Sequence, residues 1–180
     1  MNCILNKNLL RTDSCGYSLP EVKDIYLANY VDVLNINSQV GETSGGCEVI
    51  TAITMASGTT FYHVEPAKNS VTFTDELVVE DNGNKYRTHT LTFNTTGRYD
   101  ACQHDVFDAL SLGRFYVVVK TADGEYLALG RLTGLEASAA TLQGGGDGNG
   151  MTITLSGNVT ESAIPLAGDA ITTATNNPND

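Results

Sequence analysis

The stretch YDACQHDVFDALSLGRFYVVVKTADGEYLALGRLTGLEASAATLQGGGDGNGMTITL, residues 99–155, decides the fold class of this chain. Its first part has the spacing of an amphipathic helix, and the remainder consists of apolar runs separated by turn residues. A single short helix set into a run of strands is typical of a mainly β protein. The stretch predicts a helix at residues 100–112 and strands at residues 114–120, 126–132 and 151–155.

The expected helix carries sequence signals at both ends. Asp100 is a suitable N-cap, and Gln103 follows three residues later, as in a capping box. Gly113 has the position of the glycine that commonly ends a helix. Four side chains at helical spacing are expected to form its buried side: Cys102, Val106, Ala109 and Leu110.

The clearest β-hairpin of the chain joins residues 71–79 to residues 85–95, where apolar and polar residues alternate. Its turn consists of four residues that tolerate a positive φ: Asp81, Asn82, Gly83 and Asn84. Upstream, the aromatic and β-branched content of residues 24–33 favours a strand, although a helix is nearly as compatible. Residues 49–55 alternate as in a strand, and the polar residues 35–46 indicate a loop.

Length and charge limit the organisation and the partners. The 180 residues suit one domain, which we expect at residues 21–171, preceded by an arm at residues 1–20 and followed by a flexible tail at residues 172–180. The net charge of −11 argues against a basic grip on nucleic acid, but it is compatible with DNA passing beside an acidic wall. No run is apolar and long enough for a membrane helix, so no membrane partner is expected.

Few side chains have the types needed for catalysis or metal binding. Cys102 and His104 lie two residues apart on the expected helix and therefore point to different sides, which does not suit a nucleophile and its base. His63 and His89 lie on expected strands that could face one another, and with Glu65 they give only three of the four ligands of a zinc site. We therefore expect no enzyme, no cofactor and no metal site.

Two segments of the chain resemble known protein families. The run DVFDALSLGRFYVVVKTADGEYLALGRLTGLEASAATLQGGGDGNGMTITLSG, residues 105–157, resembles the C-terminal half of tail tube proteins of tailed bacteriophages. In that family a short helix is followed by a strand hairpin and, after a glycine-rich linker, by a final strand. The opening of the chain, with Cys3, Cys15 and IYLANY at residues 25–30, resembles small virion proteins of phages that infect Bacteroidetes.

The resemblance implies a fold, a function and a location. The fold would be a β-sandwich or half-barrel with one short α-helix packed on its side. Six copies would form a ring whose inner sheets join edge to edge, and stacked rings would form the tail tube through which the genome is ejected. The protein would be a structural, non-enzymatic part of the virion tail, assembled in the cytoplasm of the host bacterium. Its partners would be its own copies and other phage tail or neck proteins, and DNA would pass through the lumen without specific binding.

The resemblance also assigns roles to residues and leaves alternatives open. The turn of the long hairpin would reach a neighbouring subunit. Five polar side chains would face the lumen: Thr72, Thr74, Glu76, Thr152 and Thr154. A single-ring neck or tail-terminator protein of a phage is the nearest alternative. A carbohydrate-binding or adhesin β-sandwich is a more distant one, disfavoured because the chain has no Trp.

Overall fold

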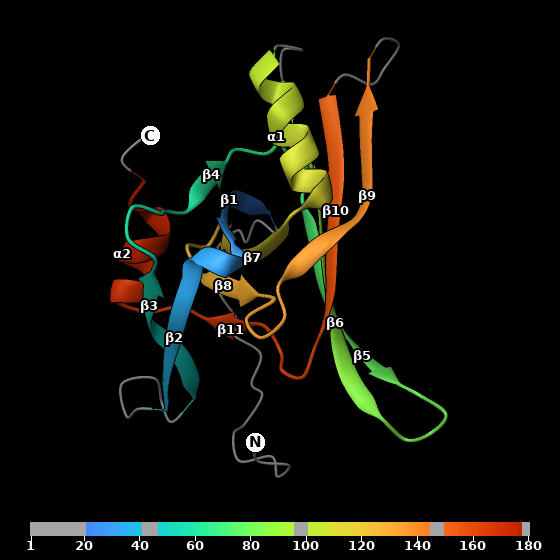
Figure 1. The fold of residues 1–180 in the computed structure, drawn as a ribbon. Helices are drawn as coiled ribbons and strands as arrows, with labels where there is room; N and C mark the ends of the chain where they lie inside the picture. The colour runs from blue at the N-terminus through green and yellow to red at the C-terminus, as the bar shows by residue number, and fades with distance from the viewer. Residues whose placement is uncertain (1–20, 41–46, 96–100, 145–149, 178–180) are drawn as a thin grey trace, which may run out of the picture.

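The computed structural model describes residues 21–40, 47–95, 101–144 and 150–177, without the side chains of residues 101–103. Over these residues the chain is mainly β, as predicted (Figure 1). The strands are β1 (Val22–Asn29), β2 (Val33–Val40), β3 (Glu48–Met55), β4 (Tyr62–Val64), β5 (Thr72–Val79), β6 (Lys85–Thr95), β7 (Arg114–Thr121), β8 (Tyr126–Leu129), β9 (Leu135–Gln143), β10 (Gly150–Val159) and β11 (Ile164–Pro165). The helical elements are η1 (Tyr30–Asp32, a 3-10 turn), α1 (Ala101–Leu112) and α2 (Asp169–Thr175).

Nine of the strands form one open antiparallel sheet that branches at β7. β7 pairs with β1 along one side, while its other side pairs with β9 through its first two residues and with β8 further along. The sheet therefore has two arms. One arm is β4-β1-β7-β8-β11, and the other is β9-β10-β6-β5, which stands at the right of Figure 1.

The first hydrophobic core lies between the two arms, because alternate residues of each strand point to the same side. Ile25 and Leu27 enter it from β1, and Leu91 and Phe93 enter it from β6. Its buried members are Val22, Ile25, Leu27, Leu91, Phe93, Leu110, Phe115, Val117, Val119, Leu129, Leu135, Ile153 and Leu155. This core fixes one face of the β9-β10-β6-β5 arm as the inner face and leaves the other face outside.

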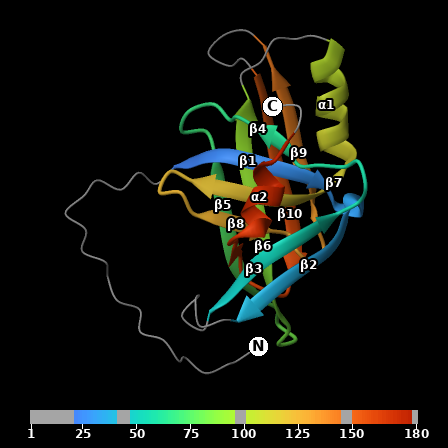
Figure 2. The same ribbon diagram turned by 90° about the vertical axis from the view of Figure 1, so that its left-hand side faces the viewer.

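A second core covers the opposite face of β1 and β7. There the β2-β3 hairpin and α2 pack on the sheet, and both lie on the same side of it in Figures 1 and 2. Its buried members are Tyr26, Ala28, Ile50, Ile53, Phe61, Tyr116, Val118, Ala128, Ile164, Leu166, Ala170 and Ala174. β7 is thus covered on both sides, which confirms the prediction of a central strand from its apolar run.

For the N-terminal part, the strand predicted at residues 24–33 was confirmed only as far as Asn29, and the loop predicted at residues 35–46 was wrong as far as Val40. The strand expected at residues 24–33 ends at Asn29, and the turn η1 then redirects the chain into β2. The loop expected at residues 35–46 is instead a strand as far as Val40, because its backbone pairs with β3. Residues 35–40 are mostly polar because the β2-β3 hairpin is largely exposed and only part of it faces the second core.

The helix α1 is confirmed, but its buried side differs from the prediction. Val106 is 50% exposed and Ala109 is exposed too, whereas Phe107 and Leu110 pack on the first core. Asp100 and the side chain of Cys102 lie outside the part that the structure describes. Gly113 directly follows the helix as predicted, and glycine is required there for a steric reason rather than for a positive φ, because a Cβ would lie 2.5 Å from Cζ of Phe115.

Three further elements were not expected. β9 was missed, as was the two-residue strand β11 beside α2, and α2 makes a second helix where one was predicted. Residues 172–175, assigned beforehand to a flexible tail, form the last part of α2, and Ala174 in it is fully buried. Residues 178–180 and the arm at residues 1–20 lie outside the described residues.

Candidate functional site

The outer face of the β9-β10-β6-β5 arm is a regular array of small polar side chains. Residues opposite each other in antiparallel strands share a face, so the pairing register defines rows across the sheet. Three of these rows are Thr72–Thr92–Thr154–Ala139, Thr74–Thr90–Ser156–Glu136 and Glu76–Thr88–Asn158, and the row Asn94–Thr152–Thr141 lies beside them. All five side chains predicted to face a lumen therefore lie on this one face, which we call the hydroxyl face.

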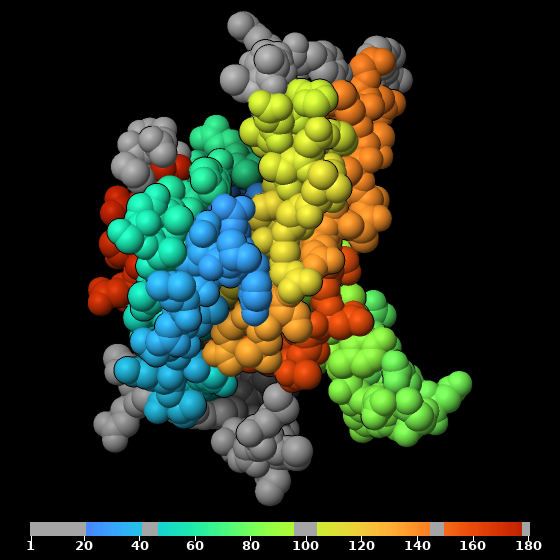
Figure 3. Space-filling view, in the orientation of Figure 1, coloured from blue at the N-terminus to red at the C-terminus, as the bar shows by residue number. Residues whose placement is uncertain are grey.

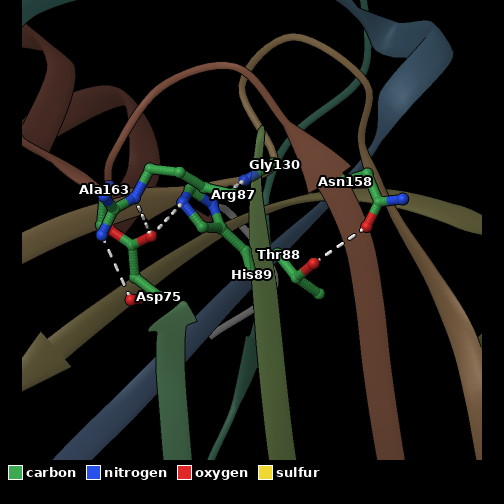
Figure 4. Close-up of polar contacts among 7 residues, drawn as sticks. All are labelled: Asp75, Arg87, Thr88, His89, Gly130, Asn158 and Ala163. Carbon is green, nitrogen blue, oxygen red and sulfur yellow. Dashed lines mark hydrogen bonds and ion pairs between the residues drawn. The ribbon is translucent and has the colours of Figure 1, made fainter. Parts of the chain in front are cut away.

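Hydrogen bonds between side chains link β6 to β10 across the hydroxyl face. Asn94 donates to the Thr152 hydroxyl at 2.9 Å, and Thr88 donates to Oδ1 of Asn158 at 3.0 Å (Figure 4). Between them the hydroxyls of Thr92 and Thr154 lie 3.0 Å apart. These rows contain two carboxylates, Glu76 and Glu136, and Arg114 of β7 lies opposite Glu136 and forms an ion pair with it. The hydroxyl face is thus polar and weakly acidic, with its hydrogen-bonding groups partly satisfied within the sheet.

Both borders of this arm are free edges in the described part of the chain. β5 pairs only with β6, and β9 beyond Glu136 pairs only with β10. A free edge exposes a row of backbone N–H and C=O groups that can pair with another strand. The arm can therefore accept a strand at each border.

Large apolar side chains are exposed on the inner-face side of both edges. On β5, Leu77 is 54% and Val79 is 57% exposed, and both lie on the same side of the strand as Phe73, which packs against the first core. On β9, Leu142 is 52% exposed and lies opposite the buried Met151. Each edge thus has a polar side and an apolar side, arranged in the same sense.

The β5-β6 hairpin extends beyond the body of the protein (Figure 3). Its turn is the one predicted from the sequence, and Gly83 adopts the expected positive φ of 86°. The amide N–H of Asn84 donates to Oδ1 of Asn82 at 2.9 Å, and Asn82 and Asn84 both donate to Glu80. The turn is therefore internally braced, and all four of its residues are exposed.

A cluster of charged and polar residues holds the base of this hairpin (Figure 4). Asp75 accepts from Nε of Arg87 and, at 2.9 Å, from the backbone N–H of Ala163. Burial opposes ionisation of Asp75, but these bonds outweigh it and lower its pKa. His89 is 1% exposed, with Nε2 3.4 Å from Oδ1 of Asp75 and Nδ1 accepting from the N–H of Gly130 at 3.2 Å. The cluster joins β5, β6 and two loops.

The residues considered for metal binding and catalysis do not come together. His63 lies on β4 and contacts Asp24 of β1 at 3.2 Å, whereas His89 lies on β6, so the prediction that they could face one another was wrong. Among the residues that the structure describes, no group of His, Cys, Asp or Glu could hold a metal ion. His104 is an exposed helix residue, as predicted, near Asp105 and Asp108.

Sequence reasoning found the hydroxyl face but missed the buried cluster. Alternation alone groups Thr72, Thr74 and Glu76, because the period of a strand is two. Nothing in the sequence links Asp75 to Gly130 and Ala163, which are far away along the chain. The chain matches no family model, no curated protein and no solved structure. No helix in the described ranges is long and apolar enough to span a membrane.

Proposed function

We propose that this protein is a structural subunit whose copies join edge to edge into a ring, and that stacked rings form a phage-type tail tube. The observation that carries the proposal is the β9-β10-β6-β5 arm. It has two free edges, exposed apolar residues on the inner-face side of each edge, and a hydroxyl face on the other side. Pairing of β5 with β9 of the next copy would satisfy both backbone edges and cover Leu77 and Leu142.

The strand directions of the arm suit such a ring. The four strands alternate in direction, so β5 and β9 run antiparallel to each other. A rotation about the ring axis keeps every copy in the same orientation. It therefore places β5 of one copy antiparallel to β9 of the next, and the antiparallel pattern continues around the ring.

The outline of the arm also suits a closed barrel. The free part of β9 is centred near Ala140, which lies level with Ile153 and Phe93, whereas β5 is centred near Asp75, opposite His89. The two edges are thus offset by about four residues, or ~13 Å, along the strands. Each copy contributes four strand spacings to the ring, counting its contact with the next copy, and these sum to ~19 Å. Copies of this outline close into a ring with strands tilted by about 35°, as in known barrels.

The hydroxyl face would line the lumen in this arrangement. Six copies, as the family resemblance implies, would give a barrel of ~24 strands with a diameter of about 45 Å, wide enough for a DNA duplex. Hydroxyl, amide and carboxylate groups make up most of this face, and Arg114 at its border is paired with Glu136, so the face offers a polyanion few of the Lys and Arg contacts that neutralise phosphates. DNA would pass without being bound.

The protruding hairpin supports stacking over a single ring. Its turn, Asp81 to Asn84, stands clear of the body and could reach a neighbouring subunit (Figure 3). A neck or terminator protein shares the edge pairing but stops at one ring. The two functions differ in the assembly product, because only a tube subunit polymerises into rods.

Native mass spectrometry and electron microscopy of the purified full chain across a range of concentrations test the proposal. We expect rings or rods, assembled through the edges. Leu77→Lys and Leu142→Lys each place a charge on the inner-face side of an edge and should abolish assembly. Val40→Lys is the matched control, because Val40 is 69% exposed on the separate β2-β3 hairpin. A monomer at every concentration, or assembly indifferent to both edge variants, would sink the proposal.

A further inference from the structure

A groove of about 560 Å³ opens between the start of β1, the β7-β8 turn and the start of β5. Its lining residues are Glu21, Val22, Val71, Thr72, Phe73, Thr121, Asp123, Glu125 and Leu127. Of the rows that form the hydroxyl face, only Thr72 lines this groove. The groove is thus separate from the hairpin cluster of Asp75 and His89.

The floor of the groove is continuous with the first core. Val22 is a buried member of that core, and Val71, Phe73 and Leu127 are partly buried side chains packed against it. An apolar side chain placed in the groove would therefore extend the core and remove this surface from water. The floor selects an apolar occupant.

The rim of the groove is acidic. Glu21, Asp123 and Glu125 all line it, and none of the described residues of the lining is basic. A cationic occupant is therefore favoured over an anionic one, with the effect screened by salt. Together, floor and rim select a segment that combines apolar residues with positive charge.

The chain itself enters the fold at this groove. The carbonyl oxygen of Glu21 accepts a hydrogen bond from Ala122 at 2.8 Å, and its Oε1 accepts one from the N–H of Asn69 at 3.0 Å. Glu21, the first described residue, therefore lies in the wall of the groove. A segment tethered at its binding site has a high effective concentration there, because loop closure costs little for short loops.

The composition of residues 1–20 matches both requirements. Ile4-Leu5, Leu9-Leu10 and Leu19 are apolar, and Lys7 and Arg11 are basic. With one acidic residue, Asp13, the segment has a net charge of +1, whereas the remaining residues carry eight bases and twenty acids, hence −12. The segment thus has the positive charge and the apolar residues that the groove selects.

We propose that this groove binds the N-terminal segment of its own chain, with leucine or isoleucine side chains on the apolar floor and Lys7 or Arg11 near the acidic rim. The proposal is independent of ring formation. It assigns the arm expected at residues 1–20 to a surface of the same molecule.

The native cysteines of the segment allow a test in the full chain. Thr72→Cys places a thiol at the groove, and Thr141→Cys, on another exposed threonine, in β9, is the matched control. Both are made in a Cys47→Ser background and treated with a short bismaleimide, and crosslinked peptides are identified by mass spectrometry. We expect crosslinks within one chain from residue 72 to Cys3 or Cys15, at a yield about tenfold above the control.

A second variant tests the nature of the contact. Leu9→Asp with Leu10→Asp should lower the yield at residue 72 several-fold, while the urea unfolding midpoint stays unchanged. Equal yields at positions 72 and 141, or no effect of the aspartates, would overturn the proposal. Crosslinks found only between chains would assign the groove to another copy and would overturn it as well.

Discussion

His89 is a buried side chain whose protonation state is fixed by its neighbours. The N–H of Gly130 donates to Nδ1, so the neutral ring carries its proton on Nε2, which faces Asp75 at 3.4 Å. A second proton on Nδ1 would point this N–H at the N–H of Gly130, so that two donors would meet without an acceptor. Burial lowers the pKa of His89 below its usual 6.5, and the charge of Asp75 opposes this only in part.

The stability of the protein should therefore fall in acid. The unfolded chain takes up a proton on His89 near pH 6.5, while the folded chain does so only at lower pH. The contribution of His89 to stability is complete above about pH 6.5 and is lost as the pH falls toward the pKa of the folded state. The loss is about 1.4 kcal/mol for each unit by which the two pKa values differ. Urea unfolding measured from about pH 8 down to about pH 5 reports the loss.

His89→Gln isolates this contribution, because glutamine offers an acceptor and a donor but does not titrate. We expect the variant to lose the part of the pH dependence that lies just below pH 6.5. His104→Gln is the control, since the His104 side chain is 74% exposed. An unchanged profile in His89→Gln would show that His89 is not the titrating group.

For single residues, the sequence predicts which face of a strand a side chain lies on better than it predicts which residues that side chain contacts. The grouping of Thr72 with Thr74 follows from alternation, and the structure places both on the hydroxyl face with Thr154. The partners of His89 lie on segments joined only by the tertiary fold. A buried histidine and an exposed one, such as His104, are therefore not distinguishable from composition alone.

The helix α2 shows how a short polar element is stabilised by its packing. Its Ala170 and Ala174 are four residues apart, fully buried, and face the second core near Ile50. Small side chains permit this close approach, so a larger or charged one has no room. The helix has only seven residues and would be marginal in isolation.

Ala174→Asp should lower the free energy of unfolding by about 3 kcal/mol, because it places an unpaired charge in the second core. Thr172→Asp introduces the same side chain at an exposed position of α2 and should change stability by less than about 0.5 kcal/mol. Urea unfolding measures both. Equal effects of the two substitutions would show that α2 does not pack as described.

Elements with strong periodicity were predictable, and those defined by tertiary pairing were not. The β5-β6 hairpin, α1 and β7 follow from turn residues and apolar spacing. β9 is built largely from Ala, Ser and Thr, and its pairing with β10 defines it. In β3 the register shift near Thr51 puts Ile50 and Ile53 on the same core, which a strict period of two excludes.

For the whole molecule, the ring proposal requires two different edges that recognise each other. A contact between β5 and β9 is heterologous, so each copy uses one edge toward each neighbour and the series closes. A symmetric contact of β5 with β5, or of β9 with β9, would instead stop at a dimer. The two arrangements bury similar apolar side chains, but they differ in the size of the assembly and in their response to blocked edges.

Mixing the two edge variants distinguishes these arrangements. Leu77→Lys blocks β5 and leaves β9 intact, whereas Leu142→Lys blocks β9 and leaves β5 intact. Because a heterologous contact needs one of each edge, either variant alone should stay monomeric, and the equimolar mixture should form a dimer containing both proteins and nothing larger. Native mass spectrometry resolves the two by their masses. A homodimer of Leu77→Lys would reveal β9-β9 pairing, a homodimer of Leu142→Lys would reveal β5-β5 pairing, and either one would rule out the closed ring.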